Sequence, residues 1–144
     1  MAEAFRAAID GGSRGNPGPA AWGVAVLDDA GVCIEGHGEP IGKATNNVAE
    51  YQALLEALAL AARRGATRVE IRSDSELLVR QIEGRYRVRH PALQPLHAEA
   101  ARRIRAFESF RIVHVPREEN KDADRLVNLA LDRATAGNEE TAAS

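Results

Sequence analysis

Four acidic residues stand where their carboxylates could act together, and the first three along the chain are Asp10, Glu50 and Asp74. Asp10 ends a predicted strand over residues 5–10, in which apolar residues recur at every second position, and Asp74 ends another over residues 67–74. A carboxylate at the carboxyl end of a strand is well placed to meet a ligand. It can equally form a turn or cap a following helix, so position alone leaves these alternatives open.

The residues after Asp10 predict a loop. The segment DGGSRGNPGPAAWG, residues 10–23, has four glycines and two prolines between positions 11 and 19, which disfavours regular structure. A backbone with so little side-chain bulk would let a ligand come close to the carboxylate.

Glu50 belongs to a predicted helix over residues 45–64. Helical periodicity puts it on the same stripe as the apolar residues Leu54, Ala57 and Ala61. An ionised carboxylate on this inward face is costly unless it pairs with a basic residue or binds a metal ion. An arginine partner is therefore the alternative to a metal site.

The last predicted helix, residues 121–134, carries two further aspartates. Asp122 aligns with Arg125 and Arg133, which is an exposed arrangement. Asp124 lies nearer the apolar stripe of the helix, so it is predicted to be the inward carboxylate.

Carboxylates gathered in one place repel one another by roughly 4 kcal/mol per pair at about 4 Å and an effective dielectric constant near 20. Such a cluster persists by raising a pKa or by binding a cation. Oxygen ligands suit Mg²⁺ or Mn²⁺, and a single cysteine, Cys33, excludes a cysteine-rich zinc site. Two such ions about 4 Å apart can activate a water molecule and stabilise the leaving oxygen of a phosphodiester.

The composition indicates one globular domain of 144 residues, with 44% hydrophobic and 28% charged residues and a net charge of −2. No apolar run approaches the roughly 18 residues that a membrane span needs, and the N-terminus lacks the apolar core of a signal peptide. We therefore expect a cytoplasmic protein that does not enter membranes.

Patterning predicts the element order β-β-β-α-β-α-α-β-α. The remaining elements are a hairpin over residues 21–40, helices over 75–84, 90–107 and 121–134, and a strand that begins at 109. This order indicates an α/β domain with a mixed sheet, because helical crossovers make parallel neighbours. We expect the domain to span residues 1–134 and the small, polar residues 135–144 to be a disordered tail.

Residues 84–105 contain six arginines and one glutamate, with an aromatic residue at Tyr86. A local basic surface with an aromatic residue suits a phosphate backbone. A solvated helix surface is the alternative interpretation.

Four blocks in this order carry a family resemblance: DGGSRGNPGPAAWG, TNNVAEYQALLEAL, SDSELLVRQI and REENKDADRLVNLA. Together they resemble type 1 ribonuclease H, and more closely its short bacterial and archaeal branch, over roughly residues 4–134. The resemblance implies a ribonuclease-H-like fold, with a five-stranded mixed sheet flanked by helices on both faces. It also implies Mg²⁺-dependent hydrolysis of the RNA strand of RNA–DNA hybrids, with two ions per site and Mn²⁺ as a substitute. We expect the protein to be a monomer.

The resemblance assigns roles to residues of this sequence. The carboxylates that hold metal and carry catalysis would be Asp10, Glu50, Asp74 and Asp124. The residues that touch the RNA strand near its 2′-hydroxyls would be Gly11, Gly12, Ser13, Asn46, Asn47 and Ser75, and those that hold a DNA phosphate would be Asn16 and Thr45. Short amides and hydroxyls suit a 2′-hydroxyl, which both donates and accepts, although ordinary helix capping also explains Asn46 and Asn47.

Two features depart from the family pattern. No lysine-rich insert is present between residues 84 and 96, and no histidine stands clearly in the loop before the last helix. His114 has a family-like spacing to Asp124 but falls within a predicted strand, where we expect it to be fixed and buried. Arg117 occupies the loop, and we expect it, if either, to assist catalysis by its charge, because arginine stays protonated.

Two other functions compete with a hybrid endonuclease. A hybrid-binding module without catalysis would not need carboxylates at all four positions. A different metal hydrolase on the same fold remains open in principle, since fold does not fix function. The paired asparagines and the GNPG segment favour a hybrid substrate.

Overall fold

A computed structural model describes residues 4–143, with the side chains of residues 4–136. Its centre is a five-stranded sheet in the order β3-β2-β1-β4-β5. The strands are β1 (Ala4–Ser13), β2 (Gly18–Leu27), β3 (Cys33–Ala44), β4 (Arg68–Ser73) and β5 (Ser109–His114). The first three pair antiparallel, whereas β4 pairs parallel to both β1 and β5, so the mixed sheet expected from the sequence is confirmed.

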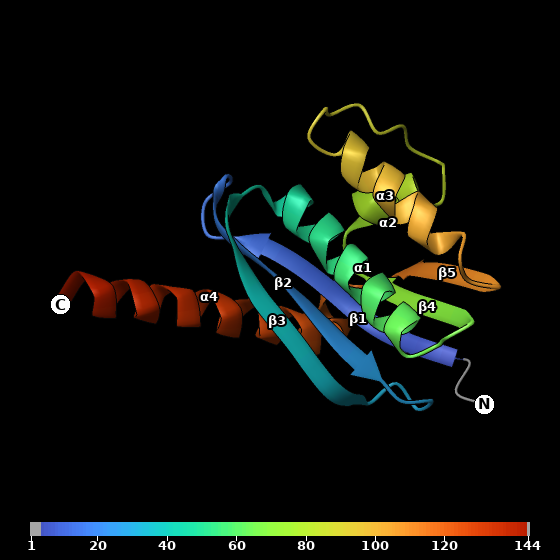
Figure 1. Ribbon diagram of the computed structural model, residues 1–144, viewed down its shortest axis with the longest axis horizontal. Helices are drawn as coiled ribbons and strands as arrows, with labels where there is room; N and C mark the ends of the chain where they lie inside the picture. The colour runs from blue at the N-terminus through green and yellow to red at the C-terminus, as the bar shows by residue number, and fades with distance from the viewer. Residues whose placement is uncertain (1–3, 144) are drawn as a thin grey trace.

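Helices cover both faces of this sheet (Figure 1). They are α1 (Asn46–Arg63), α2 (Glu76–Ile82), α3 (Gln94–Ile104) and α4 (Lys121–Ala143), with a short 3₁₀ turn, η1 (Arg117–Glu119), before α4. Neighbouring glycines in β1 show the two faces directly, because Gly11 lies against α1 and Gly12 faces Val127 of α4. The predicted order of strands and α-helices is confirmed.

The main core lies between the sheet and α1. Leu54 and Leu58 of α1 are fully buried against strand residues such as Ile9 and Ile71. Each buried side chain of this size contributes about 1.5–3 kcal/mol to folding. A smaller apolar layer under α4 contains Ala123 and Val127. The helix stripes that fill these layers also fix which way the acidic residues of α1 and α4 point.

Strand β1 does not end at Asp10, as the sequence had led us to expect. It continues through Gly11 and Gly12 to Ser13, which pairs with Ala20 of β2. A methyl group on Gly11 would overlap the backbone of α1 at Ala49. The glycine therefore lets a helix approach the strand, and the loop that we expected from residue 11 begins only after Ser13.

The last helix also differs from expectation. We expected it to end at residue 134 and the tail at 135–144 to be disordered, but α4 runs to Ala143. Residues 134–143 contain several alanines and glutamates, which are strong helix formers. The prediction for this segment relied on its small and polar residues and did not take this helix propensity into account. Among the described residues, no helix is long and apolar enough to cross a membrane.

Candidate active site

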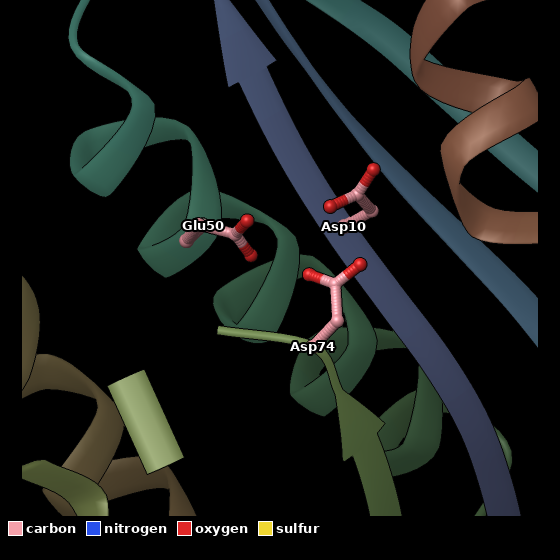
Figure 2. A group of neighbouring side chains, drawn as sticks. All are labelled: Asp10, Glu50 and Asp74. Carbon is pink, nitrogen blue, oxygen red and sulfur yellow. The ribbon is translucent and has the colours of Figure 1, made fainter. Parts of the chain in front are cut away.

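The carboxylates of Asp10, Glu50 and Asp74 converge at one edge of the sheet (Figure 2). One oxygen of each lies within 4.8 Å of the others. Asp10 and Asp74 come together because β1 and β4 run parallel and their ladder ends at the pair Ile9–Ser73, one residue before both aspartates. Glu50 joins them from the second turn of α1, which the close contact at Gly11 holds against β1.

Burial and crowding raise the pKa values of Asp10 and Glu50. Asp10 is 7% exposed and Glu50 is 8% exposed. Burial, followed by the charges of Asp74 and Asp124, raises the pKa of Asp10 to about 7. Burial and the charges of Asp10 and Asp74 also raise the pKa of Glu50 well above its ordinary value.

Glu50 lacks the arginine partner that was the alternative to a metal site. Burial and the neighbouring carboxylates dominate its pKa, and no basic side chain is among the causes of the shift. Its buried Oε2 has no hydrogen-bond partner among the described residues. Hard oxygen ligands with an unpaired buried oxygen fit a divalent cation such as Mg²⁺ or Mn²⁺.

Asp124 lies at the edge of this cluster. It is half-buried on α4 and lines the same cavity of about 500 Å³ as the other three carboxylates, but it is not one of the three that converge. Asp122 is exposed and pairs with Arg125 at 3.7 Å. The inward and outward positions expected from helical periodicity are therefore correct for both residues.

All six residues expected to touch the RNA strand line this cavity. They are Gly11, Gly12, Ser13, Asn46, Asn47 and Ser75. Asn16 and Thr45, expected at a DNA phosphate, are not among the lining residues. The cavity therefore gathers the acidic cluster and a rim of small polar groups.

Hydrogen bonds fix the orientation of this rim. Asn46 Oδ1 accepts from the backbone nitrogen of Ser13 at 2.8 Å and from its hydroxyl at 3.1 Å. The Asn46 backbone nitrogen donates to Asn16 Oδ1 at 3.0 Å. These bonds join the end of β1 to the start of α1, and they leave Asn46 Nδ2 as the group with which this side chain can donate to a ligand.

Two of the predicted binding residues cap helices. Thr45 Oγ1 accepts from the Val48 backbone nitrogen, and Ser75 Oγ accepts from the Leu78 backbone nitrogen, both at 3.2 Å. Capping thus belongs to Thr45 and Ser75 rather than to Asp74 or the paired asparagines. The Asp74 carboxylate is not needed at the helix end and is available to the cluster.

The two auxiliary candidates separate in the structure. Arg117 lies in η1, is exposed and lines the cavity. His114 is the last residue of β5, as the strand pattern predicts, but it is exposed and does not line the cavity. The expected burial of His114 is wrong, because the core that covers Ile112 does not extend to the end of this edge strand.

Sequence reasoning missed two polar residues of the cavity, Arg14 and Asn128. Arg14 donates to Asp132 at 2.7 Å and to Asn128 at 3.5 Å, which ties the turn after β1 to α4. The sequence did contain a signal for Asn128, because residues 124, 128 and 132 recur every four positions and so share one face of a helix.

Comparisons with known proteins identify relatives of this chain. A family described as "Reverse transcriptase-like" matches residues 8–130. Ribonuclease HI of Halobacterium salinarum is 47% identical over 127 residues, which are 88% of this chain and 63% of that protein. The chain spans 35% of the next three curated relatives that it matches.

Two solved structures have the same fold at clear sequence identity. RNase H1 from Halobacterium salinarum has a TM-score of 0.86 at 42% identity, covering 90% of this chain and 98% of that one. LC11-RNase H1, solved in complex with an RNA/DNA hybrid, has a TM-score of 0.86 at 43% identity, covering 91% of this chain and 99% of that one. The chain therefore belongs to the ribonuclease H1 family.

Proposed function

We propose that this chain is a metal-dependent endonuclease that hydrolyses the RNA strand of RNA–DNA hybrids. The observation that carries the proposal is the convergence of three carboxylate oxygens within 4.8 Å, two of them from buried side chains with raised pKa values. Similarity over nearly the whole length of a ribonuclease H1 solved with a hybrid supports the choice of substrate.

The proposed centre consists of Asp10, Glu50, Asp74 and Asp124 with two Mg²⁺ ions, for which Mn²⁺ can substitute. Ions held there would supply an activated water and stabilise the leaving 3′ oxygen, so that the products carry 5′-phosphate and 3′-hydroxyl ends. The chain itself holds these carboxylates from four segments, namely β1, α1, the end of β4 and α4, and leaves Asp10 and Glu50 little exposed to solvent. The raised pKa of Asp10 means that ion binding must displace a proton near neutral pH.

The substrate contacts follow from the rim of the cavity. Asn46 Nδ2, Asn47 and the hydroxyls of Ser13 and Ser75 would bind the 2′-hydroxyls of the RNA strand, next to the backbone of Gly11 and Gly12. Asn16 and Thr45 would face a DNA phosphate, and Arg117 would assist by its charge. We propose that the protein acts as a monomer in the cytoplasm.

The test is a panel of end-labelled substrates of one sequence: RNA–DNA hybrid, single-stranded RNA, double-stranded RNA and double-stranded DNA. We expect cleavage of the RNA strand of the hybrid with Mg²⁺, none with EDTA, and products with 5′-phosphate ends. Products with 2′,3′-cyclic phosphates would exclude the proposed mechanism. Hybrid binding without cleavage at any Mg²⁺ or Mn²⁺ concentration would identify a binding module instead.

A further inference from the structure

Asn120 is a buried amide to which neither the sequence motifs nor the proposed mechanism gives a role. It lies between η1 and α4, and its side chain is 1% exposed. Its Nδ2 donates to the backbone oxygen of Ile9 at 2.9 Å, while its Oδ1 has no hydrogen-bond partner among the described residues. Burying an amide whose oxygen has no hydrogen-bond partner costs folding free energy, so the presence of Asn120 at this position needs a specific explanation.

The bond to Ile9 falls where the pairing of β1 with β4 ends. Ile9 directly precedes Asp10, and its pair with Ser73 is the last one between β1 and β4. Asp10 and Asp74 follow directly after that pair, where β1 remains paired only with β2. The Asn120 amide supplies a donor to β1 at this last position and so restrains the backbone next to Asp10.

The backbone of Asn120 makes two further connections. Its oxygen accepts from the backbone nitrogen of Asp124 at 3.1 Å, and its own nitrogen donates to the oxygen of Arg117 at 3.0 Å. One residue thus links β1 beside Asp10 to the first turn of α4, which carries Asp124, and to the turn that carries Arg117. A neutral amide makes this link without adding charge to a cluster of repelling carboxylates.

We infer that Asn120 is a positioning residue that sets the distance of Asp124 and Arg117 from Asp10. It does not line the cavity, and so it acts through the backbone rather than on the substrate. Without its donor, α4 keeps its apolar contacts with the sheet through Val127 and Leu131 but loses the fixed register of its first turn against β1. Groups that orient metal ligands from behind typically contribute 10–100-fold to metal affinity or activity.

The test compares two substitutions. Asn120→Leu has a similar size and no donor, and Asn120→Ser has a hydroxyl that ends one bond short of the amide nitrogen and leaves a polar, uncrowded site. Leu93→Ala, in the main core at the start of α3, serves as the control for a general loss of stability. Each variant is examined for Tm, for Mn²⁺ binding by calorimetry without substrate, and for kcat and KM on an RNA–DNA hybrid.

We expect both Asn120 variants to bind Mn²⁺ on the order of tenfold more weakly and to lose on the order of tenfold in kcat, with KM for the hybrid nearly unchanged. Leu93→Ala should lose Tm without either change. The inference is overturned if the Asn120 variants match the wild type in Mn²⁺ affinity, whatever their Tm. Because the kinetic readout rests on the proposed function, a wild type that does not cleave the hybrid would refute that function, and the Mn²⁺ titration would still decide the role of Asn120.

Discussion

At the scale of single residues, Asp10 carries the clearest electrostatic consequence of the site. Its pKa is raised from 3.8 to about 7 by burial and by the neighbouring carboxylates. The folded protein therefore holds this proton more tightly than the unfolded chain does. The stability that the proton provides is fully present below about pH 4 and is lost as the pH rises through about 7.

This linkage predicts a pH-dependent effect of Asp10→Asn on the metal-free protein. With EDTA present, the substitution should raise Tm at pH 8, where the wild-type carboxylate is ionised among other carboxylates, and should change it much less at pH 5. Added Mg²⁺ should raise the Tm of the wild type and have little effect on the variant. Differential scanning calorimetry at the two pH values measures this, and a large loss of stability in Asp10→Asn at pH 8 would instead indicate that the carboxylate supports the fold.

Asp122 and Asp124 provide a matched pair two residues apart on α4. Asp124→Asn should lower kcat by at least about tenfold, because that carboxylate lines the cavity and acts on Asp10. Asp122→Asn should leave kcat within about twofold, since it removes an exposed ion pair with Arg125, of a kind that contributes little. Steady-state kinetics on a hybrid substrate compares them, and equal losses would show that the assignment on this helix is mistaken.

At the scale of elements, the contact between β1 and α1 decides whether Asp10 and Glu50 meet. Gly11 allows it because any side chain there would overlap the backbone of Ala49 and Glu50, whereas a methyl group on Gly12 would lie 3.6 Å from Val127. A side chain at position 11 would push α1 away from β1, whereas a methyl group at position 12 would make an ordinary van der Waals contact.

Gly11→Ala should therefore destabilise the protein by about 1–3 kcal/mol or more, the cost typical of overpacking against a rigid backbone. It should also weaken Mg²⁺-dependent activity, because it separates Asp10 from Glu50. Gly12→Ala is the matched control and should change stability by well under that amount. Urea denaturation of both variants provides the measurement, and similar free energies of unfolding would contradict the close contact.

Sequence reasoning placed the carboxylates on the helices correctly, but it misplaced the end of β1. Periodicity placed Glu50 and Asp124 inward, because a helix stripe can be counted along the chain. The end of β1 was misplaced, because composition does not distinguish a glycine that permits a loop from one that admits a neighbouring helix. The bond from Asn120 to Ile9 spans 111 positions and follows only from the folded topology.

At the scale of the whole molecule, the charge distribution raises the question of how a protein with net charge −2 would attract a polyanion. The loop between α2 and α3 carries exposed arginines at 85, 87 and 89, beside a half-exposed Tyr86. Figure 1 shows this loop projecting beyond the sheet, away from α4. A local basic surface of this kind can contact phosphates even though the total charge is negative.

Replacement of Arg85, Arg87 and Arg89 by alanine should weaken hybrid binding and flatten its dependence on salt. Each phosphate contact that is lost should lower the slope of log K against log salt concentration by roughly one unit. The control is replacement of Arg68 and Arg111, which line a pocket where β1, β4 and β5 begin, at the other end of the strands from the carboxylates, and this should leave the slope unchanged. An unaltered slope in the triple variant would mean that these arginines do not touch the hybrid.

The central claim is that the carboxylate cluster makes this chain a metal-dependent nuclease for hybrids. The most direct test is the single-turnover rate of RNA-strand cleavage as a function of Mg²⁺ concentration, for the wild type and Asp10→Asn, with hybrid binding measured in parallel. We predict that the wild-type rate rises from undetectable in EDTA to a plateau, while Asp10→Asn binds hybrid but stays near background at every concentration. Undiminished wild-type cleavage in EDTA, or an Asp10→Asn variant as fast as the wild type, would contradict the claim.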